Sequence, residues 1–315
     1  MHLLLTEYCC VHATADPLGQ ALLHEGWGML RALIEDLLQS RSGHLTLLAG
    51  PLLESQSRTF PEVDWIATRP ETEMDLLAQL APRVDASLVI APECHGLLFE
   101  RVSAVLDAGG RSLNCDPEFI RIASDKSATN SLILPTVRWS PELEWNQYPA
   151  VVKPIDGAGS QATFLVLDRD ELVCRVREAS SLGWPDLIVQ PYLEGTSASV
   201  VRLAGAHGQM CPATEQVIST DGRFQYLGAR YPLLIQEPLA YASGSDMRGR
   251  RGWIGTDYHV ATGAVFDINP RMTTSYLALR QRCRSNLADA MVRIALGESL
   301  PTLEWDDTPL EFRIE

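Results

Sequence analysis

The chain has 315 residues, of which 46% are hydrophobic and 21% charged, an ordinary globular composition with room for one large domain or two to three modest ones. Its net charge of −14 repels phosphate backbones and anionic bilayers, so we expect neither nucleic acid nor a membrane as a partner. The first residues lack a basic region and no apolar run could span a bilayer, so neither a signal peptide nor a transmembrane segment is expected. Seven scattered cysteines without a CxxC pair fit a reduced, cytoplasmic environment.

Strands alternate with helices in the first third of the chain. Short buried strands are expected at 3–5, 45–49 and 86–91, and hydrophobic periodicity predicts helices over 19–39 and 96–108. A Gly109-Gly110 pair ends the second helix, and a short strand then leads to Asn114. This alternation predicts a parallel sheet, and residues 1–115 are expected to form a small α/β domain.

The remainder of the chain has a different pattern, rich in short strands. The expected strands lie at 148–155, 161–167, 186–190, 196–204, 214–219, 224–229, 252–260 and 264–269, and the expected helices at 171–181 and 276–296. This pattern predicts an α+β region with antiparallel hairpins.

Lysine is rare in this chain, because 24 of the 26 basic residues are arginine and only Lys126 and Lys153 are lysine. Arginine and lysine are nearly exchangeable on ordinary surfaces, whereas a tight anion site can require a compact ammonium group. The two lysines are therefore candidates for a functional site. The alternative is chance survival under a compositional bias.

A glycine-rich turn follows Lys153 in the stretch VVKPIDGAGSQATFLV, residues 151–166. Gly157 and Gly159 carry no Cβ, so backbone N–H groups of the turn can approach an anion closely. The stretch lacks the GxxxxGK[ST] pattern, and a strand rather than a helix follows it, which excludes a dinucleotide fingerprint. The alternative interpretation is a glycine hairpin beside a surface lysine.

An acidic hairpin is expected in DYHVATGAVFDINPR, residues 257–271. A three-residue loop ending at Gly263 would place Asp257 opposite Asp267, and Asn269 would share their face of the strand. Two carboxylates this close repel unless a cation lies between them, and hard oxygen ligands suit Mg²⁺ shared with phosphate. Arg271 could then clamp a phosphoryl group. The alternative is a solvated acidic face with a turn at its end.

A third motif, VQPYLEGTSASV at residues 189–200, ends one strand and begins another where the chain is expected to cross between two lobes. Backbone groups freed at such a hinge can bind an adenine edge. Glu194 could accept hydrogen bonds from ribose hydroxyls.

Taken in order, SDKSAT, VVKP with its glycine loop, QPYLEG and DINPR resemble the ATP-grasp superfamily over about residues 86–280. Within it, APE at 91–93, NCD at 114–116, SDK at 124–126 and NPRMTTSY at 269–276 are similar to the tyramine–glutamate ligase family of methanofuran biosynthesis, and the stretch HEG at 24–26 more loosely so. The resemblance implies an ATP-grasp fold, combining α/β and α+β regions. Its parts would be an N-terminal Rossmann-like (pre-ATP-grasp) domain at 1–115, a lid subdomain at 116–190 and a C-terminal antiparallel α+β domain with a Mg²⁺ site at 191–315.

The resemblance also implies a role for each motif. Arg271 and Lys153 would be catalytic, and Mg²⁺ (or Mn²⁺) would be held by Asp257, Asp267 and Asn269. Most ATP-grasp enzymes have Glu where Asp267 stands, which bears on whether one or two metal ions bind. The residues expected to contact ATP are Lys126, Lys153, Asp156, Gly157, Ala158, Gly159, Ser160, Gln190, Pro191, Tyr192, Leu193 and Glu194.

The implied activity is an ATP-dependent ligation of a carboxylate to an amine through an acyl phosphate. The resemblance points to glutamate and a tyramine- or tyrosine-like amine, and ATP-grasp ligases are often homodimers. A ligase for other amino acids or peptides and a non-catalytic ATP-binding regulator are the alternatives. The paired carboxylates argue against the regulator, because a site that no longer catalyses a reaction does not require them.

Two further groups of residues suggest other chemistry. Cys94 and His95 are adjacent, so on a strand their side chains would point apart and could not pair as nucleophile and base. His2, Cys9, Cys10 and His12 match no zinc-binding spacing. We expect packing or surface roles for both groups.

Overall fold

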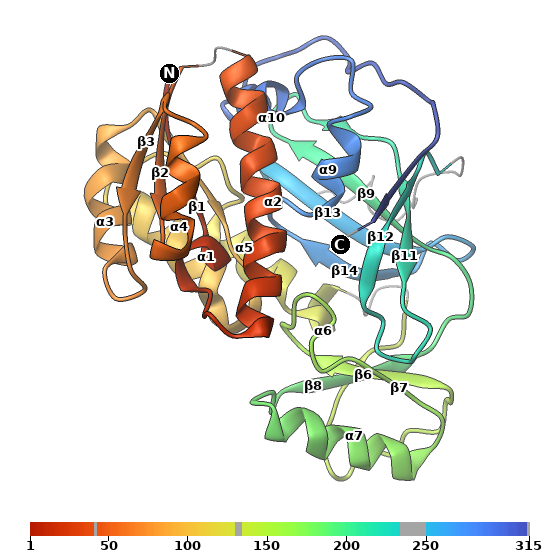
Figure 1. The fold of residues 1–315 in the computed structure, drawn as a ribbon. Helices are drawn as coiled ribbons and strands as arrows, with labels where there is room; N and C mark the ends of the chain where they lie inside the picture. Colours follow the sequence, from red (N-terminus) through yellow and green to blue (C-terminus); the bar gives the residue numbers. More distant parts are fainter. Residues whose placement is uncertain (41–42, 130–133, 234–249, 314–315) are drawn as a thin grey trace.

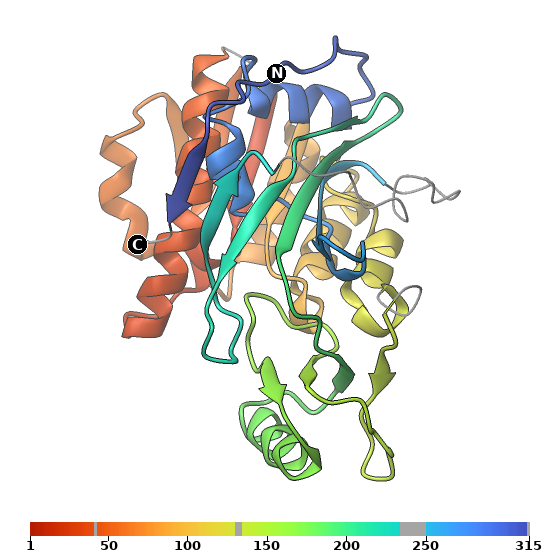
Figure 2. The same ribbon diagram turned by 90° about the vertical axis from the view of Figure 1, so that its right-hand side faces the viewer.

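The computed structural model describes residues 1–40, 43–129, 134–233 and 250–313. The first and last thirds of the chain lie side by side and form the larger part, here called the body, while a small sheet with one helix projects beneath it (Figures 1 and 2). This projecting part, residues 137–191, is here called the lid.

A parallel sheet forms the N-terminal side of the body, in the order β3-β2-β1-β4. Its strands are β1 (His2–Glu7), β2 (His44–Ala49), β3 (Val63–Ala67) and β4 (Ala86–Ile90). From the central strand β1 the chain adds β2 and β3 on one side and then returns to add β4 on the other. The carboxyl ends of β1 and β4 therefore flank a topological switch point, the usual place for a ligand in such sheets.

Helices cover both faces of this sheet, which explains why its central strands are almost entirely buried. The helical segments in this region are α1 (Tyr8–His12), α2 (Pro17–Gln39), η1 (Pro51–Arg58), α3 (Glu73–Leu80), η2 (Ala81–Arg83), η3 (Cys94–Gly96), α4 (Leu97–Asp107), α5 (Pro117–Ser124) and α6 (Lys126–Thr129).

A seven-stranded antiparallel sheet forms the C-terminal side of the body, in the order β14-β13-β9-β11-β12-β15, with β10 paired to β9. Its strands are β9 (Ser197–Ala204), β10 (Gln209–Met210), β11 (Thr214–Ile218), β12 (Tyr226–Tyr231), β13 (Gly252–His259), β14 (Val265–Asn269) and β15 (Leu310–Arg313). Two helices, α9 (Ser275–Leu279) and α10 (Leu287–Ala295), pack between this sheet and α2.

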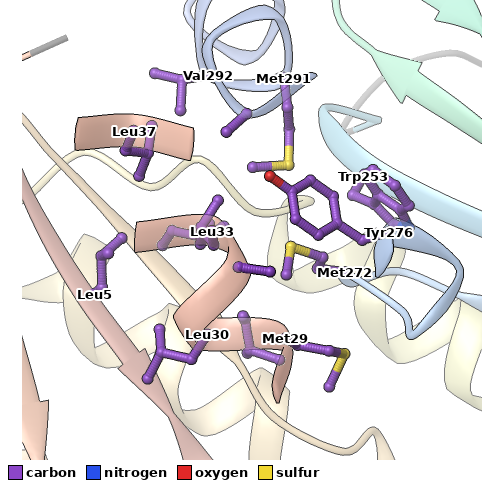
Figure 3. Packing of buried hydrophobic residues seen from close by; sticks show 14 of the residues in the cluster. Leu5, Met29, Leu30, Leu33, Leu37, Trp253, Met272, Tyr276, Met291 and Val292 are labelled. Atoms are coloured by element: carbon purple, nitrogen blue, oxygen red, sulfur yellow. The ribbon is translucent and has the colours of Figure 1, made fainter. Parts of the chain in front are cut away.

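The two sides of the body share one hydrophobic core. Leu30 and Leu33 of α2 lie between the parallel sheet and a group of C-terminal side chains that includes Trp253, Tyr276 and Met291 (Figure 3). Asp36, on the same helix, accepts hydrogen bonds from the Tyr276 hydroxyl and from Arg280 Nε, the latter at 2.8 Å. The N- and C-terminal parts of the chain therefore depend on each other for burial.

The lid has a separate core. Its sheet, ordered β5-β8-β6-β7, is antiparallel and is covered by α7. Its elements are β5 (Val137–Arg138), β6 (Ala150–Pro154), β7 (Phe164–Val166), α7 (Arg169–Ser181) and β8 (Leu187–Pro191). Buried apolar residues from each main element, such as Val152, Phe164 and Leu172, pack together here.

Most expected elements form near their predicted positions, but two do not. The helix expected at 276–296 is wrong as one element, because it is divided into α9 and α10. Asn286 begins α10 by accepting a hydrogen bond from the Asp289 N–H at 2.9 Å, and the segment before it pairs Cys283 with Trp305. The strand expected before Asn114 is reduced to one bridge between Ser87 and Ser112. The sequence did not predict α1, α3, α5, α6, β3, β10 or β15.

Candidate active site

The two lysines converge on one strand from opposite sides. Lys126, at the start of α6 in the body, places Nζ 2.7 Å from Asp267 Oδ1. Lys153, on β6 of the lid, donates from Nζ to the Phe266 carbonyl oxygen at 3.0 Å. Burial and the nearby Lys126 charge lower the pKa of Lys153 to about 8, although Asp267 opposes this shift. Both ammonium groups therefore lie along β14, where the lid meets the body.

The acidic hairpin has the predicted pairing, with Asp257 directly opposite Asp267. The turn itself differs from a simple three-residue loop, because His259 and Ala264 close the hairpin at its tip. A register shift between Asp257 and Tyr258 adds a residue to the second strand, and this bulge restores the expected pair. The two carboxylates thus face each other across β13 and β14.

Burial, and secondarily the Asp267 charge, raise the pKa of Asp257 to about 6. Asn269 Nδ2 donates to Asp257 Oδ2 at 3.3 Å, and Ser199 and Gln216 also hydrogen bond to this carboxyl group. Within the described ranges, no group of three or more His, Cys, Asp or Glu side chains is arranged so that it could hold a metal ion. A metal ion here would depend on the two aspartates and the Asn269 amide oxygen.

These residues fit a divalent cation. The Asp257 and Asp267 carboxylates face each other, and the Lys126 ammonium compensates only one of the two negative charges. The remaining negative charge favours a bound cation. The donors are all oxygen atoms, provided that the Asn269 amide turns its oxygen toward the aspartates. Such a set is small enough to leave positions for phosphate oxygens, as Mg²⁺ sites commonly do.

The glycine loop forms one wall of the pocket. Gly157, Gly159 and Ser160 line it, and Ser160 Oγ donates to the Phe224 carbonyl oxygen at 2.6 Å. Gly159 has a φ of +61°, which a glycine adopts without strain, and nothing lies within 4 Å of where its Cβ would be. The Asp156 side chain is directed elsewhere and accepts a hydrogen bond from the His95 N–H at 2.8 Å. Ala158 is not part of the lining either.

The connection from β8 to β9 forms another wall of the pocket. Its lining residues include four of the predicted ATP contacts, namely Gln190, Pro191, Tyr192 and Leu193. Glu194 is exposed and lies outside the lining, and its backbone oxygen lies 3.1 Å from His259 Nε2. Gly195 takes part in the lining in its place.

Arg271 lines the pocket and is held in an ion pair. Its Nε lies 2.9 Å from Glu93 Oε1, and both side chains are largely buried. The nearby charges of Glu93, Glu25 and Asp267 raise the pKa of Arg271. The guanidinium therefore stays charged and is fixed close to the acidic hairpin.

Sequence reasoning missed about half of the lining. The additional lining residues are Glu25, Val151, Thr163, Gly195, Ser197, Ser199, Gln216, Ile218, Phe224, Tyr226, Phe266, Thr273, Thr274 and Ser275. Six of them lie within the quoted motifs but were given no role, namely Val151, Thr163, Gly195, Ser197, Ser199 and Phe266, while Gln216, Ile218, Phe224 and Tyr226 lie in no quoted stretch. Glu25 and the Thr273–Ser275 run lay within stretches quoted only for their family resemblance.

Neither alternative group forms a second reactive site in the described residues. Cys94 is buried against the lid core, and burial raises the pKa of its thiol to about 11, which disfavours a nucleophilic thiolate. The His95 ring stacks on Trp184 with centroids 4.5 Å apart. His2 and His12 each contact a partner at 2.7 Å, Thr46 Oγ1 and Glu73 Oε2 respectively, and hold no metal cluster between them.

Comparisons with known proteins agree with this fold. A family model described as "ATP-grasp domain" matches residues 123–275, and one described as "pre ATP-grasp 3 domain" matches residues 51–120. Two curated relatives are tyramine–L-glutamate ligases. The protein from Methanocaldococcus fervens is 22% identical, with 95% of each chain covered. That from Methanocaldococcus jannaschii is 23% identical, covering 95% of this chain and 90% of the relative.

Solved structures share the fold. An ATP-grasp superfamily protein from Archaeoglobus fulgidus superposes with a TM-score of 0.68 at 19% identity, covering 98% of this chain and 99% of that one. L-amino acid ligase from Bacillus licheniformis gives a TM-score of 0.69 at 15% identity, covering 95% and 75%. A biotin carboxylase domain from Hydrogenobacter thermophilus, solved with MgADP, gives 0.69 at 15% identity, covering 96% and 71%.

The arrangement of a parallel sheet, a lid and an antiparallel sheet around a pocket with two lysines and two aspartates defines the class of protein. Residues 123–275 match the ATP-grasp domain family and residues 51–120 the pre ATP-grasp 3 domain family, so the chain has an ATP-grasp fold, and its relatives support an ADP-forming carbon–nitrogen ligase. Within that class it resembles tyramine–glutamate ligases. In the described part of the chain, no helix is both long and apolar enough to cross a bilayer.

Proposed function

We propose that this protein joins the carboxyl group of glutamate to a tyramine- or tyrosine-like amine, in the biosynthesis of a methanofuran-type cofactor. The observation that carries the ligase chemistry is the convergence of Lys126, Lys153 and the Asp257–Asp267 pair in one pocket between lid and body. The substrates are proposed from the two tyramine–L-glutamate ligases, which align with nearly the whole chain.

In this proposal ATP lies between the lid and β14. The adenine would lie along Gln190–Leu193, and the phosphates would extend beneath the glycine loop toward the two lysines. Asp257, Asp267 and Asn269 would hold Mg²⁺, which neutralises phosphate charge when it is bound. Mn²⁺ could take the same oxygen ligands. Because Glu194 and Asp156 lie outside the lining, we give them no role in binding the nucleotide.

The first step would transfer the γ-phosphoryl group of ATP to a carboxylate oxygen of glutamate, with ADP as the leaving group. Lys126 and Lys153 would stabilise charge on the phosphate oxygens as the bond to ADP breaks. Arg271, which lines the pocket and is held by Glu93, would contact the acyl phosphate. The protein would act mainly by positioning and charge compensation.

The second step would be attack of the amine nitrogen on the acyl carbon. The new C–N bond forms as the bond between the acyl carbon and the phosphate oxygen breaks, and inorganic phosphate leaves. The nitrogen loses a proton to give the neutral amide. Water must be kept from the acyl phosphate during this exchange, and closure of the lid against the body would do so.

A substrate panel tests the proposal. ADP release would be measured with MgATP, one carboxylate from a set of amino acids, and either tyramine, tyrosine or a second amino acid. We expect glutamate with tyramine or tyrosine to give the highest turnover, with amide product seen by mass spectrometry. If another pair is turned over while these are not, the protein is an amino-acid ligase of different specificity and the proposed substrates are wrong.

A further inference from the structure

Among the described residues, Glu25 alone lines the pocket from the first 115 positions of the chain. Every other described lining residue lies at Lys126 or beyond. Glu25 is carried by α2, the helix that also supplies Leu30 and Leu33 to the shared core. The parallel-sheet side of the body thus presents one carboxylate to a pocket otherwise built by the ATP-grasp region.

The fold places Glu25 at the switch point of the parallel sheet. Glu7, the last residue of β1, directs its carboxyl group at the adjacent Gly26, where a Cβ would lie only 2.3 Å from Glu7 Oε2. Glycine at this position therefore lets α2 approach the end of β1. Glu93, which holds Arg271, lies just beyond the carboxyl end of the neighbouring strand β4. Ligands of open parallel sheets bind at such a point.

Glu25 also lies near two residues that border the proposed metal site. The charges of Glu25 and Asp267 both raise the pKa of Arg271, and burial together with the charges of Glu25 and Asp257 raises the pKa of Tyr226. Glu25 thus shares a charged or polar neighbour with each carboxylate of the proposed metal site, namely Arg271 with Asp267 and Tyr226 with Asp257. A group bound by Glu25 would therefore lie close to the acyl phosphate.

The charge of Glu25 is left for a ligand to compensate. Its carboxylate makes no hydrogen bond or ion pair with any residue that the structure describes, and Arg271, the cation that acts on it, is already paired with Glu93. Burial raises the pKa of Glu25, because the half-buried carboxylate has lost part of its hydration. An anionic phosphate would be repelled here, whereas an ammonium group would restore the lost interactions.

We infer that Glu25 binds the ammonium group of the attacking amine and accepts a proton from it as it attacks; this inference rests on the proposed ligase function. The substrate R–NH₃⁺ gives one proton to the Glu25 carboxylate, and the freed nitrogen lone pair forms the bond to the acyl carbon. Phosphate leaves with the electrons of the broken C–O bond and takes up the second proton that the nitrogen loses, and Glu25 later releases its own proton to solvent. Specificity for a cationic primary amine is thereby assigned to the parallel-sheet side of the body.

The test compares two nucleophiles with Glu25→Gln, which keeps the size of the side chain and removes its charge. Tyramine is cationic near neutral pH, whereas hydroxylamine is small and largely uncharged and captures acyl phosphates as hydroxamates. We expect kcat/KM for tyramine to fall roughly 10- to 100-fold, as for the loss of a charged hydrogen bond. Hydroxamate formation from L-glutamate and MgATP should stay near the wild-type rate, and Glu25→Asp should recover part of the tyramine activity.

Glu35→Gln is the matched control, because Glu35 lies on the same helix, pairs with Arg31 and Arg280, and does not line the pocket. It should leave both reactions unchanged. Wild-type use of tyramine by Glu25→Gln would overturn the inference, as would an equal loss of both reactions, which would show a role toward ATP or glutamate. If the wild-type protein forms neither amide nor hydroxamate from L-glutamate, the proposed function itself fails, and the inference with it.

Discussion

The body and the lid are stabilised in different ways. The body combines residues from both parts of the chain in one core, where Leu33 of α2 packs with Trp253 and Met291. The lid has a core of its own, and it meets the body through specific contacts such as the His95 ring on Trp184 and the Asp156 carboxylate on the His95 N–H. A region with a separate core can move as a unit relative to its support.

This difference gives the two lysines different roles. Lys126 belongs to the body and forms an ion pair with Asp267, so it is fixed relative to the acidic hairpin. Lys153 belongs to the lid, and a hydrogen bond to the Phe266 carbonyl joins it to the same strand. The proposed phosphate site would therefore be complete only when the lid lies against the body. The predictions below test this division, beginning with the largest expected effect.

Lys153→Arg should lower ATP-dependent turnover by about 100-fold or more, because the buried site fits a compact ammonium and not a planar guanidinium. The measurement is ADP release at saturating MgATP, with thermal melting to show that the variant folds. Lys126→Arg is the matched change on the body side, and it should retain more activity, since a guanidinium can still pair with Asp267. Wild-type turnover in Lys153→Arg would show that the scarcity of lysine has no functional meaning.

Asp36→Ala should lower the free energy of unfolding by about 3 kcal/mol, because it leaves the buried Tyr276 hydroxyl and the Arg280 guanidinium without their shared acceptor. The loss should be global, because Asp36 joins the N- and C-terminal parts of the body. Urea unfolding followed by tryptophan fluorescence measures it. As a lid counterpart, Asp168→Ala removes the N-cap of α7 and should cost about 1 kcal/mol. An equal or larger loss for Asp168→Ala would contradict the division.

Affinity for ATP should decrease as the pH rises above about 8. The pKa of Lys153 is lowered to about 8 in the free protein, and bound phosphates would raise it by favouring the charged form. When the pH lies between the pKa of Lys153 in the free protein and its pKa in the ATP complex, binding of ATP takes up one proton. The association constant should therefore fall roughly tenfold for each pH unit in this range. Calorimetric titration with ATP from pH 7 to 9.5 measures this. Lys153→Arg keeps its charge throughout and should show no such fall, and the same slope in both proteins would assign the effect to another group.

The smallest effect is expected at the junction of lid and body. His95 has a φ of 53°, so His95→Asn keeps a residue that tolerates this conformation and removes only the stacking on Trp184. Loss of an aromatic contact of this kind is worth about 1 kcal/mol, and KM for ATP should rise by a few fold without a change in global stability. Hydrogen exchange should become faster in the lid and stay unchanged in α2. Unaltered exchange in the lid would show that the contact does not hold it.

Local patterns in the sequence predicted much of the fold and part of the site. Buried apolar runs predicted β1, β2 and β4, because a strand covered on both faces must be apolar along its length. The pairing of Asp257 with Asp267 followed from the turn between them, although a bulge rather than the simple loop produced it. These features depend on residues only a few positions apart. Family resemblance, in turn, led to the ATP-grasp fold.

Other parts of the site depend on residues far apart in the chain. The ion pair of Glu93 with Arg271 joins β4 to the end of β14, and neither local sequence indicates the partner. The helix expected at 276–296 was wrong, because the chain breaks there to pair Cys283 with Trp305 and to begin α10 at Asn286. Periodicity reports that a face is buried, but it cannot say against which element.

The sequence by itself determined much of the order of the elements, the acidic hairpin and the choice of two lysines as candidate site residues, because these are properties of composition and short-range spacing. Only the tertiary structure decided that Lys126 from the body and Lys153 from the lid reach the same strand, that Glu194 lies outside the pocket lining, and that Glu25 is part of it. The physical reason is that packing α2 between two sheets brings the start of the chain beside its end, and this burial is a property of the assembled core.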